Sequence, residues 1–204
     1  MLHSNNATET PSSISSPLAA SLPVMSDQIV PDTKNWTWVL ERRCEDCGFD
    51  ASTFDAAGTG SALRDLGERW QGVIARGDIA VRPRPDVWSR LEYACHTRDV
   101  FRIFDTRVGL MISEDGPHFA NWDQDATAVE DRYDLQDPAV VADELFTAAN
   151  ALADRFDAVR VDEWDRAGFR SDGSAFTVDS LARYLMHDPF HHLWDVDAEV
   201  PTYG

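Results

Sequence analysis

Three of the six histidines in this 204-residue sequence lie close together near its C-terminal end, at His187, His191 and His192. If this stretch is helical, His187 and His191 project from one face about one turn apart, and two imidazoles at that spacing can share a divalent metal ion. Two ligands do not complete a site, and His96 is the best candidate for the third. The alternative is a histidine cluster with a purely structural role.

Three neutral imidazoles bind zinc or a similar cation and leave one coordination position open for water or substrate. The bound metal lowers the pKa of a coordinated water or thiol, so hydroxide or thiolate is available at neutral pH. Carboxylates are expected to hydrogen-bond the other imidazole nitrogens, and Asp99 and Asp188 are the nearest. His192 points about 100° away from its neighbour on a helical wheel, so we do not expect it to bind the metal. His118 lies in an acidic loop, where we expect it to be exposed.

The three cysteines are Cys44, Cys47 and Cys95. A Cys-x-x-Cys-Gly turn is one half of a zinc ribbon, but the second half is missing because Cys95 stands alone. We therefore expect Cys44 and Cys47 to form a reduced surface turn or a redox-sensitive pair, with structural metal binding as the alternative. An odd number of cysteines with one close pair is a poor disulfide framework and favours a reducing cytoplasm.

Apolar residues at helical spacing, together with capping and proline signals, predict four helices. Their ranges are 61–76, 89–113, 137–159 and a last helix that starts near Thr177 and carries the histidines. Ser89 and Glu92 form a capping box at the start of the second helix, and Asp137 followed by Pro138 marks the start of the third. Pro189 removes one backbone hydrogen bond from the last helix and favours a kink there.

Four helices with little strand predict an all-α four-helix bundle, in which sites are built from inward-facing side chains. A short extended segment is expected around Trp36 and Trp38, whose indoles alternate with polar residues. The acidic connection 114–136 either folds over a pocket or is simply pinned to the bundle by its aromatic residues. The glycine-containing stretch 168–173 is expected to form a short hairpin or an irregular turn.

Polar composition predicts a disordered tail at 1–33, which leaves one bundle domain at 34–200. Met25 is an alternative translational start. The formal net charge of -18 argues against nucleic-acid binding, because a phosphate backbone needs a basic surface. No apolar run approaches the roughly 18–20 residues that span a bilayer, and no secretion signal is evident, so we expect no membrane contact.

The stretches Trp88–Asp99 and Met186–His192 resemble the DinB-like superfamily of metal-binding four-helix bundles. This superfamily includes thiol S-transferases that use mycothiol or bacillithiol, and the related maleylpyruvate isomerases. In the family, a tryptophan-serine opening precedes a histidine ligand in the second helix, and a His-x-x-x-His pair supplies the other two ligands. Matched residue by residue, the resemblance implies that His96, His187 and His191 hold the metal.

The resemblance further implies a metal-dependent enzyme that activates a low-molecular-weight, mycothiol-like thiol as a metal thiolate, for S-transfer or isomerisation. Zinc is the expected metal, with nickel, iron or manganese as alternatives, and the partners are a small-molecule thiol and an electrophile. A metal-assisted hydrolase that uses water is the second interpretation. The third is a non-catalytic, metal-binding stress-response protein that forms a homodimer through the faces of the bundle.

Overall fold

The computed structural model describes residues 29, 31 and 34–203. The tail predicted at 1–33 therefore falls outside the described residues except at two positions, and the boundary proposed between tail and domain stays a prediction. None of the described helices is long and apolar enough to cross a membrane.

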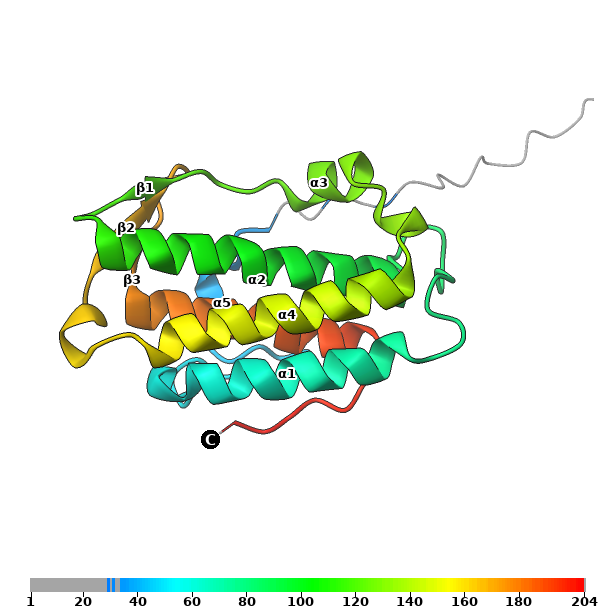
Figure 1. Ribbon diagram of the computed structural model, residues 1–204, viewed down its shortest axis with the longest axis horizontal. Helices are drawn as coiled ribbons and strands as arrows, with labels where there is room; N and C mark the ends of the chain where they lie inside the picture. The colour runs from blue at the N-terminus through cyan, green and yellow to red at the C-terminus, as the bar shows by residue number, and fades with distance from the viewer. Residues whose placement is uncertain (1–28, 30, 32–33, 204) are drawn as a thin grey trace, which may run out of the picture.

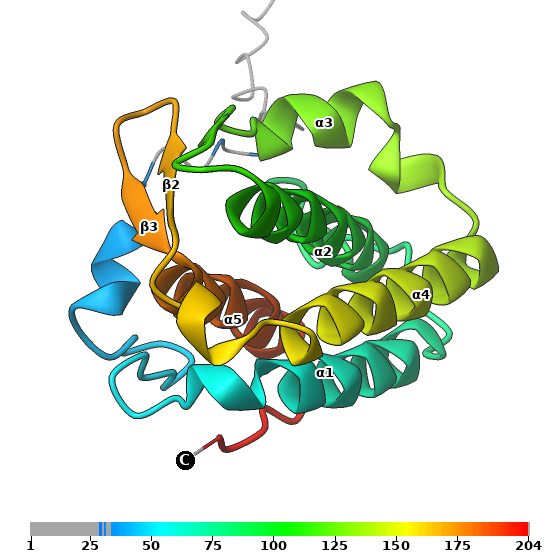
Figure 2. The same ribbon diagram turned by 60° about the vertical axis from the view of Figure 1, so that its left-hand side comes forward.

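Four long helices form the bundle that the sequence predicts (Figure 1): α1 (Thr59–Ile74), α2 (Arg90–Ser113), α4 (Pro138–Asp157) and α5 (Val178–Asp195). Helix α4 packs between α1 and α2, and α5 closes the ring by contacting both α2 and α1 (Figure 2). The fold class is thus confirmed as a four-helix bundle. Its core is filled by large apolar side chains, which include Leu63, Leu66, Trp70, Phe101, Leu145, Leu152, Leu181 and Leu185.

The helices begin where the sequence places their caps. The Ser89 backbone amide donates to the Glu92 carboxylate (2.7 Å) while the Ser89 hydroxyl accepts from the Glu92 amide (3.2 Å), which completes the predicted capping box of α2. The Asp137 carboxylate accepts a hydrogen bond from the Ala139 amide (2.8 Å) at the start of α4. Helix α5 is continuous across Pro189, so its histidines keep regular helical spacing.

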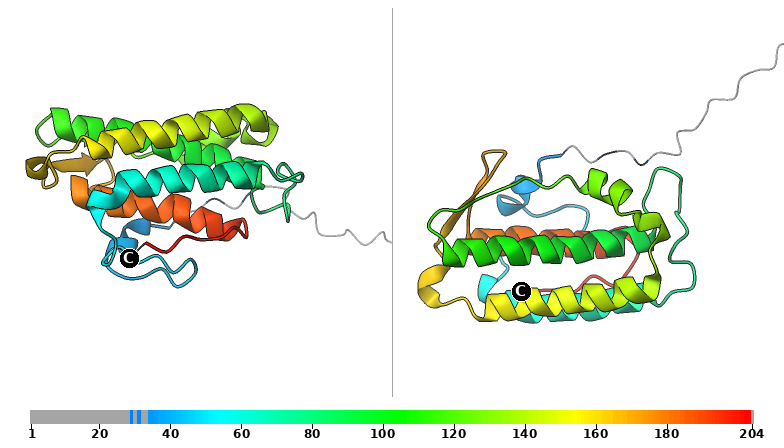
Figure 3. Two further views of the ribbon diagram at one scale, coloured as in Figure 1. Left: turned by 60° about the horizontal axis from the view of Figure 1, so that its bottom comes forward. Right: turned by 45° about the horizontal axis from the view of Figure 1, so that its top comes forward.

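The N-terminal segment is not extended as predicted, because residues Trp36–Leu40 form a short 3-10 helix, η1. The Asn35 side chain accepts hydrogen bonds from the backbone amide (3.0 Å) and the hydroxyl (2.8 Å) of Thr37, and this cap favours a helical turn over a strand. A second 3-10 turn, η2, follows at Ala56–Gly58. Both turns contact α5, beside which the N-terminal segment runs (Figure 3).

The acidic connection between α2 and α4 contains more structure than its composition predicts. It holds strand β1 (His118–Phe119), helix α3 (Gln124–Glu130) and a 3-10 turn, η3 (Tyr133–Leu135). A further 3-10 turn, η4 (Val161–Glu163), precedes a hairpin of β2 (Ala167–Arg170) and β3 (Ala175–Thr177), as expected for that stretch. Strand β1 pairs parallel to β2, which anchors one end of the connection, and α3 lies over the outer side of α2 (Figure 2).

Candidate metal centre

Helix α5 presents two pairs of metal-ligating side chains that are offset by one residue. One pair is His187 and His191, and the other is Asp188 and His192. Each pair is four residues apart, so its members lie one turn above each other, whereas consecutive residues point about 100° apart. The two pairs therefore face different neighbours, and the structure brings each pair together with ligands from a different part of the chain.

The first group consists of His96 on α2 with Asp188 and His192 on α5. One ligand atom from each residue lies within 4.8 Å of the others. Nε2 of His96 is 3.3 Å from Oδ1 of Asp188, and Nε2 of His192 is 3.8 Å from the same oxygen. Two imidazoles and a carboxylate thus converge where α2 faces α5.

The polar atoms of this group are poorly satisfied by protein partners. His96 is fully buried, and neither of its ring nitrogens makes a hydrogen bond to the described residues. The Oδ1 atom of Asp188 also makes none. Buried polar atoms in folded proteins nearly always have a partner, and a divalent cation among these three residues would supply one. The residues present therefore fit a metal.

His192 is oriented for such a role by Asp195. Its Nδ1 lies 2.6 Å from Oδ2 of Asp195, so this carboxylate holds the proton on Nδ1 and leaves the lone pair of Nε2 facing Asp188 and His96. Burial opposes ionisation of Asp188, but attraction to the positive charge of protonated His96 and His192 beside it outweighs burial and keeps its pKa below the ordinary range. A divalent cation that replaced those protons would meet an ionised carboxylate and two imidazole nitrogens.

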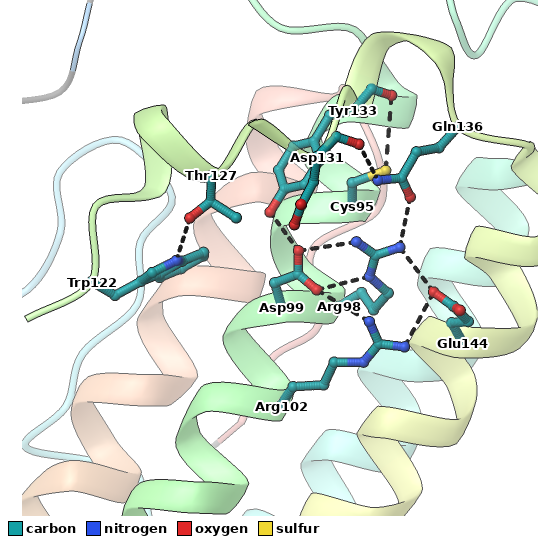
Figure 4. Close-up of polar contacts among 10 residues, drawn as sticks. All are labelled: Cys95, Arg98, Asp99, Arg102, Trp122, Thr127, Asp131, Tyr133, Gln136 and Glu144. Atoms are coloured by element: carbon teal, nitrogen blue, oxygen red, sulfur yellow. Dashed lines mark hydrogen bonds and ion pairs between the residues drawn. The ribbon is translucent and has the colours of Figure 1, made fainter. Parts of the chain in front are cut away.

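Aromatic rings hold the His96 imidazole in place. The Trp122 ring stacks on it with centroids 5.2 Å apart and planes only 10° from parallel, and the Trp88 ring lies 5.4 Å away. The Trp122 indole donates to the hydroxyl of Thr127 on α3 (2.7 Å), as Figure 4 shows. The connection between α2 and α4 therefore reaches over the site, as one of the two sequence interpretations proposed.

Asp99, considered a neighbour of the metal ligands from the sequence, belongs to a different network (Figure 4). The Arg98 guanidinium donates to both of its oxygens (2.8 and 3.0 Å), and the Tyr133 hydroxyl donates to Oδ2 (2.5 Å). Burial raises the pKa of Asp99, but these donors reverse the effect and hold it below its usual range. Both carboxylate oxygens are thus occupied, and the bond from Tyr133 to Oδ2 joins α2 to the η3 turn.

A cavity of about 700 Å³ opens beside the first group, with Asp188 in its wall. Other walls come from Trp36, the segment 121–126 and the arginines Arg107 and Arg170. Burial, and then the nearby charge of Arg170, lower the pKa of Arg107 to about 10, so its guanidinium remains charged at neutral pH. The cavity is within the size range of small-molecule sites. Its wall holds both cationic side chains and carboxylates, which are Lys34, Arg107, Arg170, Asp123, Asp125, Asp172 and Asp188.

The second group consists of His187 and His191 together with Cys44 and Cys47. Burial, and then the neighbouring His191, lower the pKa of His187 to about 4, so its imidazole is neutral at neutral pH. Burial also raises the pKa of the Cys47 thiol to about 12. Cys44 is buried with its Sγ 3.6 Å from Nδ1 of His191 on α5, so the pair is not the reduced surface turn that the sequence predicted as one possibility. The other possibility, a redox-sensitive pair, stays a prediction.

The structure thus divides the three predicted ligands between the two groups. His96 lies with Asp188 and His192, while His187 and His191 lie with the cysteines, so the three do not meet in one group. That any of them binds a metal stays a prediction. The exposed His118 stacks on the Phe169 ring in the small sheet, at a centroid distance of 5.2 Å, as expected for a residue outside the site.

The fold and these groups define a four-helix bundle with two candidate metal centres that share ligands from α5. The chain matches the family model of the DinB superfamily over residues 62–196, and it therefore belongs to this superfamily. Among solved structures it is similar to one described as "YfiT from Bacillus subtilis is a probable metal-dependent hydrolase with an unusual four-helix bundle topology". The match has a TM-score of 0.61 and 14% identity, and covers 68% of this chain and 82% of YfiT, so it shows a shared fold. No curated protein matches the chain.

Proposed function

We propose that this protein is a metal-dependent enzyme whose divalent cation is held by His96, Asp188 and His192. The observation that carries the proposal is the convergence of these three side chains, with buried nitrogens on His96 that make no hydrogen bond to described residues, beside a cavity of about 700 Å³. Membership of the DinB superfamily and the description of YfiT as a probable metal-dependent hydrolase support it. The proposed ligand set keeps His96 from the sequence prediction and replaces His187 and His191 by their neighbours on α5.

The chemistry follows from the number and type of these ligands. Catalytic zinc sites commonly have three protein ligands, including sets of two histidines and one carboxylate, whereas closed structural sites have four. A divalent metal held by His96, Asp188 and His192 would lower the pKa of a bound thiol or water and so supply a nucleophile at neutral pH.

The protein itself positions the reacting groups. Trp122 and Trp88 fix the ring of His96, and Asp195 fixes the tautomer of His192. Segment 121–126 covers one side of the cavity and restricts the access of water. Arg107 places a buried positive charge in the wall, where it would orient an anionic group of the electrophile.

We propose a low-molecular-weight thiol, such as mycothiol, as the nucleophile, transferred to an electrophile or used in an isomerisation. Support comes from the thiol-dependent members of the superfamily, and from a cavity as large as those that hold small-molecule ligands. Water is the second candidate, giving a hydrolase. It is favoured by the set of two histidines and one carboxylate, which is typical of hydrolytic zinc enzymes.

A direct assay tests the function and separates the two nucleophiles. The zinc-loaded protein is incubated with a chromogenic electrophile and with a chromogenic ester, each with and without added thiol. Turnover of the electrophile only with thiol supports the transferase, and ester turnover without thiol supports the hydrolase. The His96→Ala variant should lose either activity while His118→Ala retains it. Activity that survives in His96→Ala would reject this group as the site.

A further inference from the structure

The cysteine turn and two histidines of α5 form a second cluster whose geometry matches a metal site. The four ligand atoms of Cys44, Cys47, His187 and His191 all lie within 4.8 Å of one another. Sγ of Cys44 is 3.6 Å from Nδ1 of His191. Zinc bonds of about 2.3 Å to sulfur and about 2.0–2.1 Å to nitrogen place these two atom types about 3.6 Å apart at a tetrahedral centre.

The backbone of the turn is folded to present both sulfurs to α5. The Gly48 amide donates to the Cys44 carbonyl (3.0 Å), and the Cys44 amide donates to the Phe49 carbonyl (2.8 Å). Gly48 has a φ of 81°, in the left-handed region that glycine adopts without strain. These bonds close a tight turn directly after Cys47, so both thiols face the same helix.

This cluster, the closed group, offers four ligands, whereas the open group of His96, Asp188 and His192 offers three. A small pocket of about 80 Å³ touches the closed group at His187 and His191. Cys44, His187 and His191 are buried, and Cys47 is half-buried. The Trp36 ring lies 5.4 Å from the imidazoles of both histidines, and the Phe49 ring lies 6.0 Å from that of His187. Four ligands enclosed by aromatic rings are typical of structural zinc sites, which leave no coordination position for substrate.

One polar atom in the cluster requires a partner. Nε2 of His187 is buried and makes no hydrogen bond to any described residue. An unsatisfied buried nitrogen costs about 1–3 kcal/mol, which a ligand at this position would remove. The ligand atoms of two thiols and a second imidazole lie within 4.8 Å of the ligand atom of His187.

We propose that Cys44, Cys47, His187 and His191 form a structural zinc site, separate from the His96, Asp188 and His192 group. Zinc binds both sulfurs as thiolates, so binding releases the two thiol protons to solvent while both imidazoles remain neutral. The proposal does not rest on the proposed enzymatic function, since the site offers no open position.

This site would join parts of the chain that are far apart. Cys44 and His191 are 147 residues apart in sequence, and a shared ion would fasten the N-terminal segment to α5. Because His187 and His191 alternate with Asp188 and His192 on that helix, the same ion would fix the rotation of α5 that directs the second pair towards His96. The zinc site would thus position the open group indirectly.

Cobalt binding to the full-length chain tests the proposal. The protein is stripped of metal, kept reduced, and titrated with cobalt, because thiolate ligands give a charge-transfer absorption that imidazole and carboxylate ligands do not. The unmodified protein and the variants His96→Ala and Cys95→Ala should show this absorption, and added zinc should abolish it. The double variant Cys44→Ser/Cys47→Ser should lack it, and zinc should raise its thermal stability less than it raises that of the unmodified protein.

The proposal can be tested even if the double variant fails to fold, because the unmodified protein should itself show the absorption. A second variant, Cys47→His, keeps four ligands. It should still bind cobalt, with a weaker charge-transfer absorption that reflects one thiolate. Absence of the absorption in the reduced, unmodified protein would overturn the proposal, as would its survival in the double variant. A Cys44–Cys47 disulfide that re-forms in air while zinc is present would also overturn it.

Discussion

At the scale of single residues, the one-residue offset between the two pairs on α5 determines the proposed chemistry. Asp188 and His192 are directed towards His96, while His187 and His191 are directed towards the cysteines. A carboxylate in the open group makes it an oxygen- and nitrogen-ligand site, and thiols in the closed group make it a softer one. The two proposed sites would thereby differ in character, although adjacent residues of one helix supply their ligands.

Asp195 is expected to control metal affinity at the open group through His192. Replacing Asp195 by Asn removes the negative charge that holds the proton on Nδ1 of His192, and such orienting carboxylates typically contribute about 10–100-fold to metal affinity. We expect a loss of that size in zinc titrations of the open group. The control is Asp197→Asn, an exposed position where no change is expected. Equal affinity in both variants would contradict the assigned role.

Arg107 is expected to bind an anionic group of the substrate. A hydrogen bond to a charged group contributes about 1.5–3 kcal/mol. Arg107→Met should therefore raise the KM for an anionic electrophile about 10–100-fold, while the KM for a neutral analogue should stay nearly unchanged. Methionine keeps the contacts with Phe104 and Phe119 that the arginine makes in the wall. The exposed Arg84→Gln serves as the control. An equal effect on both substrates would indicate a structural role.

At the scale of elements, the structure of the site depends on contacts that join the α2–α4 connection to the bundle. Tyr133 in η3 is fully buried and binds Asp99 on α2, and Arg98 links the same carboxylate to Glu144 on α4 (2.9 Å). Trp122 in the same connection stacks on His96. The network in Figure 4 therefore fixes the segment that covers the cavity.

Removing the Tyr133 hydroxyl should destabilise the protein in a pH-dependent way. Tyr133→Phe deletes a hydrogen bond to an ionised carboxylate, which should lower the free energy of unfolding by about 1.5–3 kcal/mol at neutral pH. The pKa of Asp99 is lowered in the folded state, so its stabilisation is present above the ordinary value of 3.8 and is lost as the pH falls through the folded value.

Urea unfolding at neutral and at acid pH measures this effect. The difference between Tyr133→Phe and the unmodified protein should shrink once Asp99 is protonated, while Leu135→Ala, an exposed change in the same turn, should have little effect at either pH. A difference in the free energy of unfolding that does not change with pH would show that the Tyr133 hydroxyl does not stabilise the protein through its bond to ionised Asp99.

Local signals in the sequence were sufficient to predict the long helices but not the short ones. Caps and proline positions define the start of α2 and α4, and their apolar spacing defines the faces in the core. Helix α3 and the turn η1 are too short to carry a clear apolar period, and each depends on one capping side chain, Asp123 or Asn35. They were therefore predicted as a loop and an extended segment.

The candidate site was predicted only in part, for a related reason. The sequence shows two pairs with the same four-residue spacing, and nothing local indicates which pair faces α2. Two histidines at this spacing predict a metal site at His187 and His191, whereas Asp188 and His192 lie with His96. The packing of α5 against α2 and the N-terminal segment determines which pair faces α2, and local spacing contains no signal for such long-range packing.

At the scale of the whole molecule, zinc at the cysteine group is expected to stabilise the fold. Because the ion binds the folded chain, zinc at about 100 times its Kd for this group should add about 2.7 kcal/mol to the free energy of unfolding. For a domain of this size this corresponds to a rise in Tm of about 5–10 °C. Thermal unfolding with zinc and then with excess chelator measures it, and an unchanged Tm would contradict the structural role.

The assignment of two separate centres is tested most directly by locating the metal itself. Crystals grown with zinc and measured on both sides of its absorption edge should show two anomalous peaks in each chain, corresponding to the two groups. One peak should lie among Cys44, Cys47, His187 and His191, and the other among His96, Asp188 and His192. A single peak bound jointly by His96, His187 and His191 would contradict the account.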